Sequence, residues 1–275
     1  MDLKQLIAEA YAEDIPSGDI TTSGLGLKEK IGTARLVAKE DLVLSGLEVF
    51  SECVHSRDSA LTLKWQFKDA DLILNQQTVC LIKGNLLTLL QAERVALNFL
   101  GHLSGIATLT RCFAQAVSST KCKILDTRKT MPLLRALEKS AVRDGGGENH
   151  RMNLSDAILI KENHIRAAGS LTQAVRSLRQ SSRADIEVEC STLQEVELAM
   201  GEKVQRILLD NMSAEEIHAA RKIIPSHIQI EASGNMTLDR VAEVAATGVD
   251  YISVGALTHS APCADFSLLF DWPNT

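Results

Sequence analysis

The stretch DIEVECSTLQEVELAMGEKVQRILLD, residues 185–210, contains the unit that decides the fold. Two short apolar runs, DIEVEC and RILLD, flank a segment in which apolar residues recur at helical spacing. A strand, a helix and a second strand in this order are typical of a βαβ unit, whose two strands are parallel.

The same alternation extends in both directions from this stretch and starts near residue 122. The expected strands are CKILD, AILIK, DIEVEC, RILLD, IQIEAS and YISVG, and a helical pattern separates each from the next. Six strands joined by helices indicate a parallel sheet. This periodicity fits both an open doubly wound sheet and a barrel.

The last residue of each expected strand favours the barrel. Each strand ends on a polar or small residue, in chain order Asp126, Lys161, Glu189, Asp210, Ser233 and Gly255. In α/β barrels the active site is built at the carboxyl ends of the strands. Six such ends with complementary charges predict an α/β barrel with a site on that face.

The chain before the barrel predicts an α+β domain with an antiparallel sheet. The expected elements are a helix at 3–12, strands at 33–44, 61–67 and 78–83, and a helical pattern to residue 116 that is interrupted near Gly101 and Gly105. We predict a first domain at 1–104 and a barrel at 105–261, with residues 262–275 packing back on the first domain.

Composition limits the class of protein. The 275 residues are 45% apolar and 23% charged, with a formal net charge of −6, which disfavours a general nucleic-acid-binding surface. No apolar run reaches the roughly 18 residues of a membrane helix, and acids stand where a signal peptide needs bases. Six scattered cysteines without a CxxC pair predict reduced thiols in a cytoplasmic protein.

Basic residues gather between the first and second barrel strands. Arg128 and Lys129 follow the first strand, Lys161 ends the second, and His150 and Arg151 follow the glycines of GGGENHR. Arginine offers a fork for carboxylate or phosphate and lysine a compact charge, so we expect an anionic ligand. On the intervening helix, the spacing of Arg135, Lys139 and Arg143 predicts a solvated face with paired acids.

Two acids and two glycine-containing segments complete the expected rim. Glu189 and Asp210 could hold a divalent cation, bind sugar hydroxyls, stabilise an oxocarbenium-like transition state, or simply neutralise Lys161 and Arg128. The segments ASGN (232–235) and VGAL (254–257) follow the last two strands, where barrels often bind phosphate.

Several long motifs resemble quinolinate phosphoribosyltransferase. They are DTRKT (126–130), GGGENHRMNLSDAILIKENH (145–164), ILLDN (207–211), EASGNMT (231–237) and TGVDYISVGALTHS (247–260), with EDIPSGDITT (13–22) and QAERVALNFLGHLSGIAT (91–108) in the first domain. The resemblance implies an N-terminal α/β sandwich and an incomplete barrel. It also implies a cytoplasmic, magnesium-dependent enzyme of pyridine-nucleotide biosynthesis that works as a dimer or an assembly of dimers.

The resemblance assigns roles by position. Quinolinate would be bound by Arg128, Arg151 and Lys161, with His150 in the same pocket, GGG clearing room for the ring, and Arg94 reaching in from a neighbouring subunit. From the residues alone, Arg94 is an ordinary surface arginine on a helix. Phosphoribosyl pyrophosphate and magnesium would be bound by the remaining set: Thr127, Lys129, Glu189, Asp210, Ser233, Gly234, Asn235, Ser253, Val254, Gly255 and His259.

Two departures and three alternatives accompany this assignment. Met131 and Leu133 stand where the family commonly has Thr and Gly. A related group from molybdenum-transport operons lacks the counterparts of Asp126 and Lys161, which this chain keeps. The alternatives are a phosphoribosyltransferase for another pyridine-like substrate, a barrel aldolase with Lys161 as Schiff base, and a phosphoribosyl-binding regulator.

Overall fold

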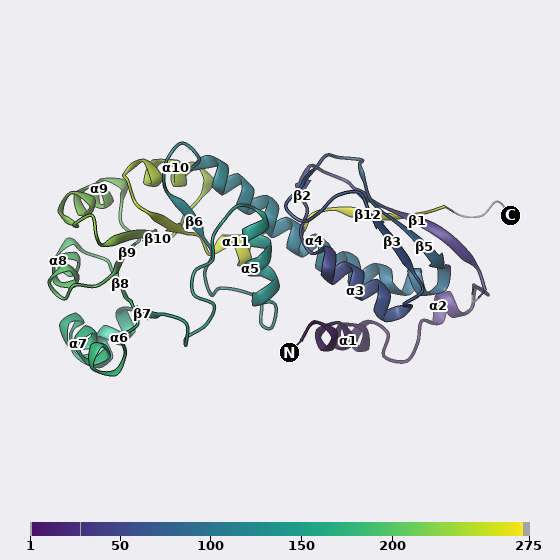
Figure 1. Cartoon of the computed structure of the whole chain (residues 1–275), viewed down its shortest axis with the longest axis horizontal. Coiled ribbons are helices and arrows are strands. Elements are labelled where there is room, and N and C mark those ends of the chain that lie inside the picture. The colour runs from purple at the N-terminus through teal and green to yellow at the C-terminus, as the bar shows by residue number, and fades with distance from the viewer. Residues whose placement is uncertain (1, 28, 272–275) are drawn as a thin grey trace. The chain divides into compact units, whose positions relative to one another are not determined.

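The computed structural model describes residues 2–27 and 29–271, which fall into two compact units (Figure 1). The first unit comprises Met1–Leu109, Pro132–Gly146 and Ala261–Thr275; the second comprises Thr110–Met131 and Gly147–Ser260. Residues 132–146, which the sequence placed in the barrel, therefore group with the first unit. Residues 272–275 of the expected C-terminal segment lie outside the described residues.

The first unit combines helices with an antiparallel sheet. Its elements are α1 (Leu3–Asp14), α2 (Ile20–Ser23), β1 (Ile31–Ala38), β2 (Leu42–Val43), α3 (Leu47–Arg57), β3 (Thr62–Trp65), β4 (Leu72–Ile73), β5 (Thr78–Asn85), most of α4 (Leu86–Ala116), α5 (Arg135–Asp144) and β12 (Phe266–Asp271). The main sheet has the order β12-β1-β5-β3, and β2 pairs with β4. The C-terminal strand thus pairs with β1, from Thr33 opposite Asp271 to Ala38 opposite Phe266.

The long helix α4 runs without the interruption that we expected at its glycines. A Cβ at Gly101 would lie 2.8 Å from the carbonyl oxygen of Ala264, and one at Gly105 would collide with the carbonyl oxygen of Pro262. The amide of Ala264 also donates to the carbonyl of Gly101 at 2.9 Å. The two glycines allow the returning chain to lie against the helix, so they mark close packing and not a break.

Helix α5 differs from the expected solvated face at two positions. Glu138 and Lys139 are fully buried, and Nε2 of His102 lies 2.7 Å from Oε1 of Glu138. Arg143 remains exposed. The helical spacing identified the face that carries charge but could not show that part of it packs inside the unit.

The second unit is a parallel six-stranded sheet in which helices follow the strands. Its elements are β6 (Lys123–Leu125), β7 (Ile158–Ile160), α6 (Glu162–Ala168), α7 (Leu171–Ser181), β8 (Ile186–Cys190), α8 (Leu193–Gly201), β9 (Arg206–Asp210), α9 (Ala214–Ile223), β10 (Gln229–Ser233), α10 (Leu238–Ala246), β11 (Tyr251–Ser253) and α11 (Ala256–His259). The order β6-β11-β10-β9-β8-β7 leaves β6 and β7 as the two edges. The sheet is therefore an incomplete α/β barrel, as the sequence predicted.

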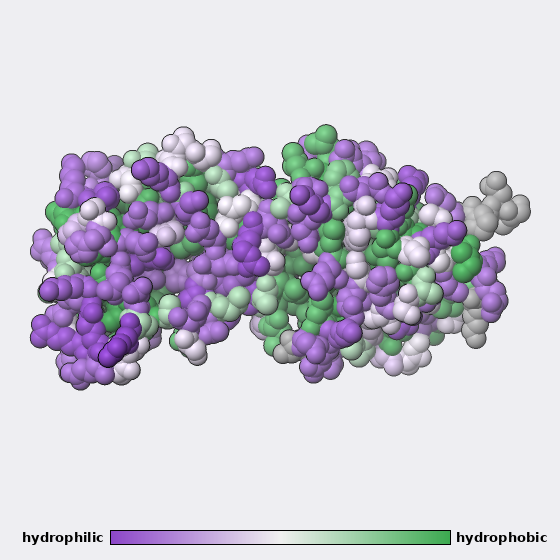
Figure 2. Space-filling view, in the orientation of Figure 1, coloured by the Kyte–Doolittle hydropathy of each residue, from purple (hydrophilic) through white to green (hydrophobic). Residues whose placement is uncertain are grey.

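Local sequence explains why these helices start where they do. Ser170, Thr192 and Ser213 cap α7, α8 and α9 by accepting a backbone N–H three residues later. Each helix buries one apolar stripe on the sheet, and hydrophilic residues predominate over α6 to α9 on the face shown in Figure 2. Because neighbouring strands of this sheet are parallel, their carboxyl ends lie at one rim.

Two global expectations concern membranes and thiols. Among the described residues, none of the helices has the length and apolar character to cross a membrane. The six cysteines are free thiols, and burial raises the pKa of Cys53, Cys80, Cys122 and Cys190 to about 12.

Candidate active site

A cavity of about 870 Å³ opens at the carboxyl ends of the barrel strands. It lies within the second unit. The predicted site residues on its wall are Thr127, Arg128, Lys129, His150, Arg151, Lys161, Glu189, Asp210, Ser233, Gly234, Asn235, Ser253, Gly255 and His259. The cavity thus brings together residues that lie up to 132 positions apart in the chain.

Positive charge concentrates on one part of this wall. Arg128, Lys129 and Arg151 come from the loops beside β6, and Lys161 directly follows β7. Burial, and then the neighbouring charge of Arg128, lower the pKa of Arg151 below its ordinary value. Guanidinium groups that repel one another in a half-buried pocket are stabilised by an anion with more than one negative charge.

A buried carboxylate holds the GGGENHR segment in place. Glu148 forms a single parallel bridge with Leu125, next to the edge strand β6. The fully buried Asp126 then accepts the side-chain amide of Asn149 at 2.6 Å and the backbone N–H of His150 at 2.9 Å. Asp126 therefore positions the loop and is not itself one of the residues that line the cavity.

The glycines of this segment have a different role from the one we expected. The amides of Gly145 and Gly146 donate to the carbonyls of Ala141 and Arg143, so they end α5, and Gly146 has a φ of 92°. The residues at 145–147 are not among those that line the cavity. The structure thus gives these glycines a role at the end of α5, where the left-handed backbone of Gly146 favours glycine.

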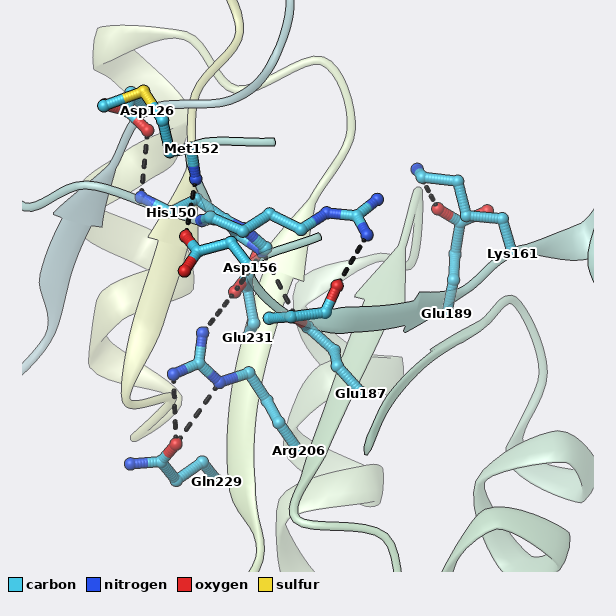
Figure 3. Close-up of polar contacts among 12 residues, drawn as sticks. Asp126, His150, Met152, Asp156, Lys161, Glu187, Glu189, Arg206, Gln229 and Glu231 are labelled. Carbon is cyan, nitrogen blue, oxygen red and sulfur yellow. Dashed lines mark hydrogen bonds and ion pairs between the residues drawn. The ribbon is translucent and has the colours of Figure 1, made fainter. Parts of the chain in front are cut away.

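The two predicted acids end adjacent strands. Oε2 of Glu189 lies 2.6 Å from Nζ of Lys161 (Figure 3), and Asp210 accepts the side-chain amide of Asn211 at 2.7 Å. The ion pair places a carboxylate beside this ammonium, whereas Schiff-base lysines are activated by apolar surroundings or a second cation. Two carboxylates on one wall also provide the hard oxygen ligands that suit Mg²⁺.

The two glycine-containing segments form the remaining wall. Gly234 has a φ of 97°, and a Cβ there would collide with the side chain of Asn211. A Cβ at Gly255 would lie 3.1 Å from Cδ of Lys129. The hydroxyl of Thr258 donates to the carbonyl of Lys129 at 2.8 Å and ties the two loops together. Both segments present bare backbone to the cavity, which suits a phosphate group.

Two predicted residues lie elsewhere. Val254 is buried and is not one of the residues that line the cavity. Arg94 is an exposed residue of α4 in the first unit and does not line it either. Further lining residues that we did not predict are Leu159, Leu208, Asn211, Glu231, Met236, Thr237 and Ala256.

His150 was predicted from the sequence, but the charged residues that surround it inside the barrel were not. His150 and Glu231 both line the cavity, and Nε2 of His150 lies 3.2 Å from Glu187 and 3.6 Å from Glu231 (Figure 3). Arg206 donates to Glu231 at 3.1 Å and stacks on Tyr251. Burial and the charge of Glu187 raise the pKa of Glu231 to about 7.

The signal for this cluster was present in the strands. Side chains two positions apart point to the same face of a strand. Glu187 precedes Glu189 by two positions, Glu231 precedes Ser233 by two, and Arg206 precedes Asp210 by four. A charge at such a position faces the barrel interior beneath the rim.

Known proteins resemble the chain over nearly its whole length. Residues 19–104 match the family model described as quinolinate phosphoribosyl transferase, N-terminal domain, and residues 106–269 match the C-terminal domain model. A probable nicotinate-nucleotide pyrophosphorylase [carboxylating] of Synechocystis is 45% identical, covering 94% of this chain and 88% of the relative. One of Bacillus subtilis is 38% identical, with 98% and 93% covered. The solved nicotinate-nucleotide pyrophosphorylase of Francisella tularensis has a TM-score of 0.94 at 39% identity, with 98% and 96% covered.

Proposed function

The chain belongs to the quinolinate phosphoribosyltransferase family, and we propose how its barrel cavity divides that reaction between two half-sites. The enzyme joins quinolinate to phosphoribosyl pyrophosphate and yields nicotinate mononucleotide, carbon dioxide and pyrophosphate, a step of NAD biosynthesis. The division into half-sites rests on one observation: the cavity has a strongly basic part and a part with carboxylates and bare backbone.

Arg128, Arg151 and Lys161 form the quinolinate half-site of this proposal. Quinolinate carries two carboxylates on adjacent ring atoms, and two arginines and a lysine can neutralise both. Burial, and then repulsion by Arg128, lower the pKa of Arg151, which supports this assignment, because a bound dianion stabilises the charged guanidinium. Bidentate bonds from a guanidinium would also fix the plane of the ring, so that its nitrogen faces the sugar.

The other residues form the phosphoribosyl half-site. Thr127, Lys129 and His259 would contact phosphate groups together with the backbone of 233–235 and 253–255. Glu189 and Asp210 would bind the ribose and hold magnesium, since their carboxylates suit a hard cation. Bound magnesium supplies charge neutralisation of the departing pyrophosphate.

The two half-sites together account for the chemistry. The ring nitrogen of quinolinate attacks the anomeric carbon of the ribose as the bond to pyrophosphate breaks, and positive charge develops on the sugar. The carboxylates of Glu189 and Asp210 stabilise that charge, while Lys129 stabilises the leaving group. Alkylation makes the ring cationic, so the electrons left by the departing 2-carboxylate are drawn into the ring before a proton replaces it.

Replacing Asp210 with Asn tests the phosphoribosyl half. The change keeps the size of the side chain but removes a charge, so we expect kcat to fall at least about tenfold and the magnesium requirement to rise. Binding of quinolinate alone should stay unchanged. Asp239→Asn, on the exposed start of α10, is the matched control. A variant of Asp210 with normal turnover and magnesium dependence would contradict the assignment.

We further propose a homodimer in which Arg94 completes the quinolinate pocket of the partner subunit. Arg94 is exposed, and the first unit exposes apolar side chains that a second copy could cover, including Ile20 at 91% and Leu25 at 61%. Mixing inactive Arg94→Ala and Lys161→Ala proteins should restore activity, because one site of each hybrid would be intact. No recovery, with subunit exchange demonstrated, would contradict this. The free thiols support a reducing compartment such as the cytoplasm.

A further inference from the structure

A charged cluster beneath the cavity is formed by His150, Glu187, Arg206 and Glu231, and of these the half-sites described above leave Glu187, Arg206 and Glu231 without a role. Its four members lie within the barrel (Figure 3). The side chain of Glu231 is fully buried and those of Glu187 and His150 are about 10% exposed or less. Buried charges are costly, so an arrangement of four ionisable groups calls for a physical explanation.

The hydrogen bonds of His150 define its protonation state. The backbone N–H of Arg151 donates to Nδ1 of His150 at 2.7 Å. A backbone amide is always a donor, so Nδ1 must be the unprotonated acceptor. The single ring proton then resides on Nε2, which faces Glu187 and Glu231.

One proton is shared between the ring and the carboxylates. Burial opposes the charged ring, but Glu187 and Glu231 together raise the pKa of His150, while burial raises that of Glu231 to about 7. The two groups therefore compete for one proton. The bond from Arg151 decides this competition in favour of Glu231, because a cationic ring has no acceptor at Nδ1.

The groups that face His150 come from three neighbouring strands. Glu187 lies on β8, Arg206 on β9 and Glu231 on β10. Asp126, at the end of β6, accepts the backbone N–H of His150. His150, Glu187 and Glu231 are also close enough to hold a metal ion, but Arg206 already supplies a positive charge at 3.1 Å from Glu231.

We propose that Glu187 and Glu231 are positioning residues, which fix His150 as the neutral Nε2–H tautomer so that its Nδ1 anchors the main chain of Arg151. His150 is then a brace between the barrel interior and the quinolinate half-site, and neither of its ring nitrogens serves as a donor to substrate. The guanidinium of Arg151 is fixed at its other end by a bond from NH1 to the carbonyl of Ala157 at 2.9 Å. This inference rests on the proposed assignment of Arg151 to quinolinate.

The tautomer can be measured without any activity. In ¹⁵N NMR of the ¹⁵N-histidine-labelled full chain at neutral pH, with His150 assigned by His150→Gln, we expect Nδ1 to resonate as an unprotonated nitrogen and Nε2 as a protonated one. Glu187→Ala should abolish this pattern. A ring protonated on both nitrogens in the unsubstituted protein, or a stoichiometric bound zinc ion, would overturn the proposal.

Kinetics test the consequence for Arg151. Glu187→Ala should raise KM for quinolinate about tenfold, the effect of one lost positioning bond, with KM for phosphoribosyl pyrophosphate within about twofold. Glu187→Gln should recover most of this loss, because its amide oxygen can take the place of the carboxylate oxygen that lies 3.2 Å from Nε2. Glu197→Gln, which removes an exposed carboxylate from α8 of the same unit, is the control.

The outcomes separate this inference from the half-site assignment. Equal losses in Glu187→Gln and Glu187→Ala would show that the charge of Glu187 matters and not the oxygen beside Nε2, and would overturn the brace. If the expected tautomer is observed but Arg151→Ala leaves quinolinate binding intact, the half-site assignment is what fails.

Discussion

Replacing Arg151 with Ala should separate the two half-sites. NH1 of Arg151 is already bonded to Ala157, so we count two of its remaining N–H groups as partners of a quinolinate carboxylate. At about 1.5 kcal/mol for each charge-assisted bond, their loss costs about 3 kcal/mol. Burial and the charge of Arg128 both disfavour the charged guanidinium and lower the pKa of Arg151, and their relief on its removal offsets part of this cost. We therefore expect quinolinate to bind about 30- to 150-fold more weakly.

Isothermal titration of each substrate alone measures this effect. The affinity for phosphoribosyl pyrophosphate should stay within about threefold, since that ligand is assigned to other residues. Arg143→Ala, which removes an exposed arginine from α5, should change neither affinity. Equal weakening of both ligands by Arg151→Ala, or no weakening of quinolinate, would refute the division of the cavity.

Three further predictions concern stability. Leu133 is 75% exposed and has a φ of 69°. Leu133→Gly should leave the melting temperature unchanged or slightly higher, because relief of about 1–2 kcal/mol of backbone strain exceeds the entropy cost of glycine. A clear fall in the melting temperature would contradict this. Gly105→Ala should cost about 2 kcal/mol in denaturant unfolding, since its methyl meets the backbone of Pro262; an unchanged midpoint would show that the contact is loose. Burial raises the pKa of Glu231 to about 7, so its protonated carboxyl contributes to the stability of the folded protein at acidic pH. This contribution is lost as the pH rises through 7. Glu231→Gln should therefore gain stability relative to the unsubstituted protein between about pH 5 and about pH 8, and a constant difference would count against the raised pKa.

The barrel could be predicted because its strands and helices are determined by local sequence patterns. Apolar runs of strand length alternate with helical stripes, and parallel strands bring their last residues to one rim. Lys161, Glu189 and Asp210 were therefore predicted to converge, and they line one cavity. The distance that joins Lys161 to Glu189 could not be predicted, because it depends on how neighbouring strands are aligned.

Other features could not be predicted because they depend on contacts between distant segments. The helix through Gly101 and Gly105 continues because the chain near residue 262 packs against it, and no local pattern contains that information. Leu133 stands where the family commonly has Gly, and its positive φ gives the reason for that preference. Glu187 and Glu231 were not predicted, because only the residues at the strand ends were considered. Their spacing of two residues from Glu189 and Ser233 places them on the same face of their strands, inside the barrel.

The most direct test of the account is an assay of the purified chain with phosphoribosyl pyrophosphate, magnesium and either quinolinate or nicotinate. Nicotinate lacks the 2-carboxylate that the basic half-site is built to hold. We predict nicotinate mononucleotide and an equal amount of carbon dioxide from quinolinate, and negligible product from nicotinate. Equal turnover of both substrates, or product from nicotinate alone, would contradict the account.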